Sequence, residues 1–121
     1  MYRVDKALDL SFLLGTDLNQ IALGRYDVQF IFDCTSKICL QSRATVLLNG
    51  EEIAEWNEDG WSSLEFQKIL NESVLGFSVP TDRLIEIQFT NGFRLCLYDD
   101  SDQYESMQIY QPDPAKPMIV I

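Results

Sequence analysis

The sequence predicts an α+β domain made mainly of antiparallel strands, with about two short helices. Three observations predict this fold: a hairpin over residues 84–97, further short segments in which apolar and polar residues alternate, and a similarity between the two halves of the chain. At 121 residues the chain fits a single domain, 1–121, and is long enough to bury a sizeable core.

The register of the hairpin follows from its alternation. A two-residue Asn91-Gly92 turn would mix polar and apolar side chains on each face, whereas a three-residue loop over Thr90–Gly92 keeps the apolar ones together. Gly92 then supplies the left-handed conformation that such a loop needs. This register pairs Phe89 with Phe93, Ile87 with Leu95 and Ile85 with Leu97.

The remaining strands are predicted from the same period of two. Three strands are expected between residues 18 and 40, and others over 44–48, 51–56, 73–79, 106–110 and 118–121. In the segment 51–56, Ile53 and Trp56 are expected to turn inward.

Two short helices are predicted from capping residues. Ser62 and Glu65 form a capping box for a helix over 63–70, which Asn71 ends, and Trp61 and Phe66 are spaced for a hydrophobic staple. Near the N-terminus, Asp9 is placed to cap a short helix that stops at Gly15. Leu8, Leu10 and Phe12 also alternate, which fits a strand.

The two halves of the chain resemble each other. Residues 28–40 match residues 85–97 without a gap, with Phe32, Cys39 and Leu40 repeated as Phe89, Cys96 and Leu97. The similarity continues upstream after one residue is removed. We therefore predict an internal repeat over roughly 12–48 and 68–110, in which each half is a short helix followed by a meander. The halves would pack as a sandwich or as a pair of half-barrels.

The charge of the chain limits its partners. Nine basic residues against nineteen acidic ones give a net charge of −10 and a pI near 4.2. Nucleic acid and anionic membrane surfaces are therefore disfavoured, because phosphates would meet a repelling field. A basic protein is the natural partner, although the charge also serves simply to keep a small protein soluble. Nothing in the composition predicts an oligomeric state.

Cysteine usage and hydropathy predict a cytoplasmic protein. The N-terminus lacks the pattern of a signal peptide, and no apolar run approaches roughly 18 residues. Cys34, Cys39 and Cys96 are an odd number without CxxC spacing, which indicates reduced thiols.

Catalytic chemistry is not indicated. The chain has no histidine, which excludes Ser-His and Cys-His pairs, and it has no glycine-rich phosphate loop. Cys34 has only Lys37 nearby to lower its pKa. An EF-hand loop starting at Asp100 would need glycine at its sixth position and glutamate at its twelfth, where this chain has Glu105 and Gln111. We expect a protein that is not an enzyme and that uses no cofactor and no metal.

Two acidic clusters are the candidate partner-binding residues. The first follows the hairpin and comprises Asp99, Asp100, Asp102, Tyr104 and Glu105. The second comprises Glu51, Glu52, Glu55, Trp56 and Asp59. Aromatic side chains within an acidic rim are typical of protein-binding surfaces. The alternative for the second cluster is a solvated charged face, with Trp56 in the core and Trp61 as the staple.

Two stretches of the sequence resemble a family. Phe12-Leu-Leu-Gly15 with Gln20-Ile-Ala-Leu-Gly-Arg-Tyr-Asp-Val-Gln-Phe-Ile-Phe32, and the hairpin running into Asp99-Asp-Ser-Asp-Gln-Tyr-Glu-Ser106, are similar to signatures of an uncharacterised family of small acidic bacterial proteins. That family has no established activity. Proteins of this kind are similar to the immunity proteins of polymorphic and contact-dependent toxin systems.

The resemblance implies a non-catalytic cytoplasmic protein that neutralises a basic, nuclease-like toxin domain. An acidic inhibitor of such a domain would gain fast, electrostatically steered association. The alternative is a small-ligand-binding or scaffold domain, with a pocket between the two sheets lined by Phe30, Phe77 or Phe89.

Overall fold

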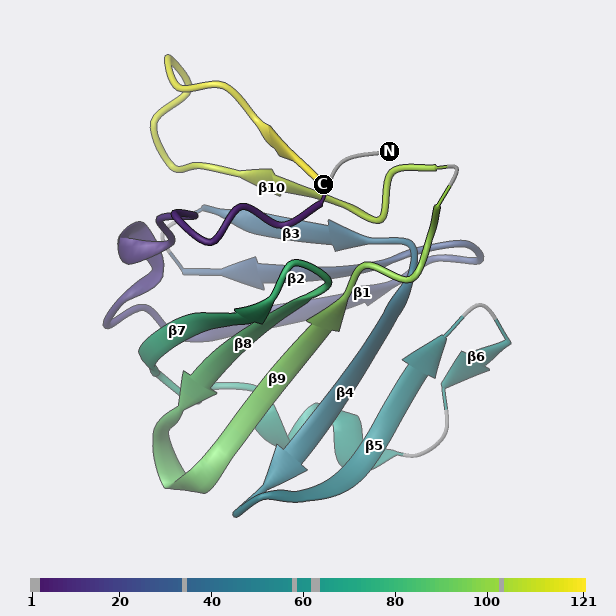
Figure 1. The fold of residues 1–121 in the computed structure, drawn as a ribbon. Helices are drawn as coiled ribbons and strands as arrows, with labels where there is room; N and C mark the ends of the chain where they lie inside the picture. The colour runs from purple at the N-terminus through teal and green to yellow at the C-terminus, as the bar shows by residue number, and fades with distance from the viewer. Residues whose placement is uncertain (1–2, 34, 58, 62–63, 103) are drawn as a thin grey trace.

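The computed structural model describes residues 3–33, 35–57, 59–61, 64–102 and 104–121. Within these residues the chain forms eleven strands in two antiparallel sheets, together with three short 3-10 helices. Strands of the two sheets run in clearly different directions where the sheets face each other (Figure 1). The expected antiparallel β architecture is confirmed.

The first sheet has five strands in the order β1-β2-β3-β10-β11. Its first three strands are consecutive in the chain, whereas β10 comes from near the C-terminus and pairs with β3. The side chains of β2 show the predicted alternation, since Val28, Phe30 and Phe32 are buried. The strands span Leu18–Leu23 (β1), Val28–Phe32 (β2), Lys37–Leu40 (β3), Met107–Tyr110 (β10) and Ile119–Val120 (β11).

The second sheet has six strands in the order β6-β5-β4-β9-β8-β7. Here β4 comes from the first half of the chain and lies between β5 and β9. The meander β1-β2-β3 is therefore extended by β10 from the second half of the chain, and the meander β7-β8-β9 is extended by β4 from the first half. The strands span Arg43–Leu48 (β4), Glu51–Asn57 (β5), Gly60–Trp61 (β6), Val74–Thr81 (β7), Leu84–Phe89 (β8) and Phe93–Tyr98 (β9).

The hairpin of β8 and β9 has the predicted register. Ile85 lies opposite Leu97 and Ile87 opposite Leu95, and all four side chains are buried. The connection Thr90–Gly92 is a 3-10 turn (η3) in which both Asn91 (φ 62°) and Gly92 (φ 81°) are left-handed.

The two predicted helices are shorter and tighter than expected. The helix predicted over 63–70 is a 3-10 helix, Leu64–Ile69 (η2), which buries Phe66 and Ile69 and is followed by a left-handed Asn71. The capping residue Ser62, Ser63 and the side chain of Trp61 lie outside what the structure describes. The N-terminal helix is Ser11–Leu13 (η1), ahead of a left-handed Gly15. Its start is marked by the Ser11 amide, which donates to the Asp9 carboxylate. Such short segments fit the 3-10 form because few α-type bonds would close within them.

The core lies between the sheets and is filled by side chains from both. Phe30 of the first sheet stacks on Phe66 of η2 with ring centroids 5.9 Å apart, and both are fully buried. Phe89 is buried in the same cluster, and Phe77 packs against it while partly exposed. The space beside Phe30, where a ligand pocket was one alternative, is therefore occupied by a ring.

Candidate functional site

The two acidic clusters lie on the second sheet. The first cluster follows β9, and most of the second belongs to β5, with β4 between these two strands. Because the strands are antiparallel, the end of β9 lies beside the start of β4, and the start of β4 lies beside the end of β5. The fold thus brings the acidic loop to the C-terminal end of β5 (Figure 1).

Arg43, the first residue of β4, joins the two clusters. Its Nε donates to Asp100 Oδ2 at 3.0 Å, and its Nη1 lies 3.5 Å from Glu55 Oε2. The guanidinium also lies over the Tyr98 ring, 3.7 Å from the centroid. Partial burial acts to lower the pKa of Arg43, but the hydrogen bond and charge of Asp100 outweigh it and raise the pKa. Arg43 therefore stays charged between two carboxylates.

A surface hollow of about 320 Å³ opens beside Arg43. Asp100 and Glu105 supply its carboxylates, and Asn57 and three serines supply further polar groups. Glu105 Oε2 accepts a hydrogen bond of 2.9 Å from the Gln108 side chain. An acidic, hydroxyl-rich hollow is suited to accept a lysine or arginine side chain. Its lining residues are Ser42, Arg43, Asn57, Asp100, Ser101, Glu105 and Ser106.

Asp99 is not part of this surface. Its side chain is 0% exposed, pairs with Arg3 Nη1 at 2.9 Å and accepts a hydrogen bond from the Ser106 hydroxyl. The expectation that Asp99 faces a partner is therefore wrong. The carboxylate instead fixes the loop from within, because it connects the loop to the N-terminal segment and to the start of β10.

Asp102 is exposed, but its carboxylate already forms ion pairs with two arginines. Its Oδ1 lies 2.5 Å from Arg3 Nη2 and 2.6 Å from Arg83 Nη2, while its side chain is 72% exposed. Hydrogen bonding to Arg83, and then to Arg3, lowers the pKa of Asp102. Tyr104, beside it in the loop, is 73% exposed.

The second cluster does not form one patch. Glu51 and Glu52 are exposed at the start of β5, and Asp59 is exposed beyond its end. At about 3.3 Å per residue the two ends of the strand lie roughly 20 Å apart. Trp56 is 3% exposed and belongs to the core, so its expected surface role is wrong. The pairing of β5 with β4 has an irregularity between Val46 and Leu47, where the register passes over Ile53, and the Ile53 side chain is only partly buried.

The free thiols that the structure describes are sheltered. Cys39 and Cys96 are both buried, and burial raises the pKa of each. Both therefore remain protonated at neutral pH, which makes them poor nucleophiles. Cys34 lies outside the described residues. Among the residues that are described, no three histidine, cysteine or acidic side chains converge as a metal site.

The arginines were missed by sequence reasoning. Arg3, Arg43 and Arg83 each hold carboxylates of the acidic loop, which makes the loop an ion-pair network rather than a run of unpartnered charge. One feature of the sequence indicated such pairing: nine basic residues stand against nineteen acidic ones, so each basic residue has several potential acidic partners.

Comparisons with protein-family models, with curated proteins and with solved structures found no match to this chain. In the described part of the chain, no helix has the length and apolarity needed to cross a bilayer.

Proposed function

We propose that this protein is a non-catalytic binding protein that neutralises a basic protein domain, most concretely an immunity protein acting on a nuclease-like toxin in the cytoplasm. The observation that carries the proposal is that Asp100 and Glu105 line one hollow beside Arg43, whose guanidinium also pairs with Glu55. The acidic loop, β4 and β5 thus each contribute a residue to this arrangement.

The proposed interface uses groups that suit a basic partner. A lysine or arginine of the partner enters the hollow and is held by the Asp100 and Glu105 carboxylates through charge-assisted hydrogen bonds. Exposed Tyr104 and the Tyr98–Arg43 stack provide the flat contacts that often dominate binding energy. The net charge of −10 accelerates the encounter.

Binding measured with purified proteins tests this surface. The partner to be tested is the protein encoded beside this chain, which the proposal requires to be basic. The variant is Asp100→Asn with Glu105→Gln. We expect its Kd to rise by about 100-fold, because lost contacts to a buried charge cost about 2–5 kcal/mol. Isothermal titration calorimetry measures the change.

The matched control is Asp33→Asn with Asp82→Asn. Like the test variant, it removes two negative charges, but from exposed positions that do not line the hollow. We expect only a modest fall in association rate. Equal losses of affinity in the two double variants would show that net charge alone matters and would refute the proposed surface.

The alternative of a small-ligand or scaffold domain with a pocket between the sheets has less support. The rings of Phe30 and Phe66 stack where such a pocket would open, and both are fully buried. The packing therefore favours a partner bound at the surface over a ligand bound between the sheets.

We further propose that the two halves arose by duplication. Support comes from hydrogen bonds that repeat at positions 56 residues apart, around the bridge between Asp17 and Ser73. The amide of Leu18 donates to Glu72 O at 3.0 Å, and that of Val74 donates to Thr16 O at 2.8 Å. The pairing irregularity after Leu18 recurs after Val74. Two halves related by a pseudo-twofold account for this correspondence.

A further inference from the structure

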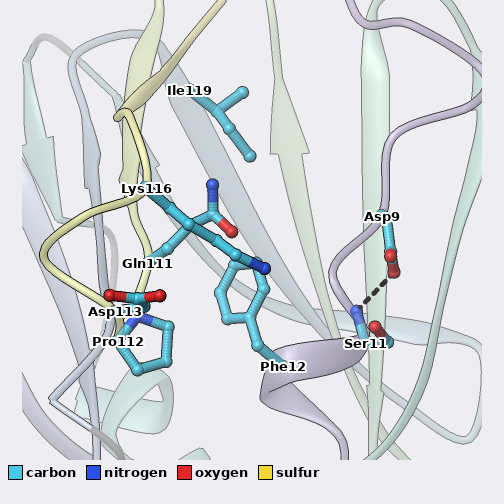
Figure 2. Close-up of a pocket in the computed structure, with 8 residues that line it drawn as sticks. All are labelled: Asp9, Ser11, Phe12, Gln111, Pro112, Asp113, Lys116 and Ile119. Carbon is cyan, nitrogen blue, oxygen red and sulfur yellow. Dashed lines mark hydrogen bonds between the residues drawn. The ribbon is translucent and has the colours of Figure 1, made fainter.

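A second surface pocket, of about 490 Å³, lies away from the acidic hollow. It opens between the N-terminal segment around η1 and the connector that joins β10 to β11 (Figure 2). Its volume falls within the usual range for small-molecule sites, about 300–1,000 Å³. The lining residues are Asp9, Ser11, Phe12, Gln111, Pro112, Asp113, Lys116 and Ile119.

Lys116 provides the positive charge of this pocket. Its side chain extends from the connector across the pocket toward η1 (Figure 2). Among the residues that the structure describes, Lys116 forms no ion pair within 4.0 Å. A cation that faces a pocket in this way is available to a carboxylate of a ligand.

Asp9 provides a negative charge on the opposite wall. Its Oδ1 accepts the Ser11 amide at 2.9 Å, which fixes the carboxylate beside η1. Hydrogen bonds from the Ser11 side chain and amide lower the pKa of Asp9, and the charge of Lys116 contributes to the same effect. The two opposite charges therefore influence each other across the pocket without forming a contact.

The apolar part of the pocket comes from Phe12 and Ile119. Both are partly buried and pack against the core, so their positions are set by the fold. Pro112 adds an apolar surface on the connector. One small pocket thus presents the Lys116 cation, the Asp9 carboxylate facing it, a second carboxylate on the connector at Asp113, and an apolar wall.

The connector that carries Lys116 is held in shape by its own hydrogen bonds. Asp113 accepts the Ala115 amide through its side chain at 2.9 Å and the Lys116 amide through its carbonyl at 3.0 Å. The Gln111 side chain donates to Pro117 O at 3.1 Å. Prolines at 112, 114 and 117 further restrict the backbone. Such preorganisation lowers the entropy lost when a ligand binds.

We propose that this pocket binds a free α-amino acid with an apolar side chain. The carboxylate of the ligand pairs with Lys116, its ammonium group pairs with Asp9, and its side chain packs on Phe12 and Ile119. An amino acid carries an ammonium group and a carboxylate on one carbon, and this pocket carries a carboxylate and an ammonium group on facing walls. This inference is independent of the proposed partner surface.

Isothermal titration calorimetry of the full chain with L-leucine tests the site. We expect saturable one-to-one binding, weakened about tenfold or more for N-acetyl-L-leucine, L-leucinamide and glycine, each of which lacks one recognised group. Lys116→Met and Asp9→Asn should each weaken leucine binding by a similar factor. The matched controls Lys68→Met and Asp33→Asn should leave it unchanged.

Circular dichroism verifies that each variant is folded, which is expected because the substituted residues are exposed. Absence of saturable binding to the wild-type chain would overturn the proposal. Equal binding of leucine and its two blocked derivatives, or unchanged binding by the folded Lys116→Met variant, would also overturn it.

Discussion

At the scale of single residues, the acidic loop is organised by Asp99. This carboxylate is enclosed, pairs with Arg3 and accepts a hydrogen bond from Ser106. Asp100, one residue later, is half exposed and pairs with Arg43. Neighbouring aspartates therefore have different roles, since the first shapes the loop and the second is available at its surface.

Asp99→Ala should destabilise the protein strongly. The substitution leaves Arg3 and Ser106 without their shared acceptor, and removing one partner of a buried pair costs about 3 kcal/mol. Urea unfolding followed by circular dichroism measures the change in free energy. Asp100→Ala is the control, and its exposed ion pair should cost no more than about 1 kcal/mol. Equal losses in the two variants would contradict the structural role of Asp99.

Asp102 should give the protein a pH-dependent component of stability. Its folded-state pKa is lowered, chiefly by Arg83, so the contribution is fully present above the unfolded pKa of about 4. It is lost as pH falls through the lower folded pKa. The difference in unfolding free energy between wild type and Asp102→Asn should thus be constant from neutral pH to about 5 and shrink below about 4.

Urea titrations across this pH range test the expectation. High salt should reduce the difference in unfolding free energy between wild type and Asp102→Asn at neutral pH. The reason is that the Asp102 side chain is 72% exposed, so its ion pairs are screened. A difference that grew on acidification would contradict the assignment.

The candidate site was only partly predictable at this scale. Asp100 and Glu105 follow from the clustering of acidic residues, but Arg43 lies 57 positions from Asp100 in the chain. Local patterns carry no information about such distant partners. The burial of Asp99 could not be predicted either, because an aspartate in an acidic run is ordinarily exposed. Its burial is tolerable because it pairs with Arg3 and accepts a hydrogen bond from Ser106.

At the scale of elements, the turns determine the strand registers. Gly92 ends the β8–β9 connection, and Gly50 lies in the β4–β5 turn. Both are left-handed, with φ of 81° and 87°. Only Gly92 is crowded, because an added Cβ would collide with the Asn49 side chain, whereas nothing lies within 4 Å at Gly50.

Gly92→Ala should therefore destabilise more than Gly50→Ala. In both variants, alanine in the left-handed conformation costs about 1–2 kcal/mol. The methyl group at position 92 must in addition displace the Asn49 side chain. Thermal unfolding of the two variants measures the comparison. An equal fall in Tm would show that the Asn49 contact contributes nothing.

Strands were predictable as elements, whereas the type of helix was not. Ile85, Ile87 and Phe89 alternate in a way that only a half-buried strand requires, and their register followed from the turn. Phe66 and Ile69, three residues apart, share a face in a 3-10 helix as well as in an α-helix. The spacing of Phe66 and Ile69 therefore could not distinguish a 3-10 helix from an α-helix. The bulge at Ile53 also left no signal in the alternation.

At the scale of the molecule, the sheet order depends on contacts between distant segments. β10 joins β3 in the first sheet, and β4 joins β9 in the second, so each half supplies a strand to the other. Strand alternation specifies which face is buried but not which edge is paired. This exchange nevertheless creates the site, because it is β4 that places Arg43 between the acidic loop and β5.

The role proposed for the hollow beside Arg43 is to neutralise a basic toxin domain. This role is tested most directly by the growth of a bacterial strain that produces the protein encoded beside this chain, which the proposal requires to be basic and toxic. Co-production of the wild-type chain should restore growth, and so should Asp33→Lys with Asp82→Lys. Asp100→Lys with Glu105→Lys, at the same soluble level, should fail to protect. Full protection by that variant, or a neighbouring product that is neither basic nor toxic, would contradict the account.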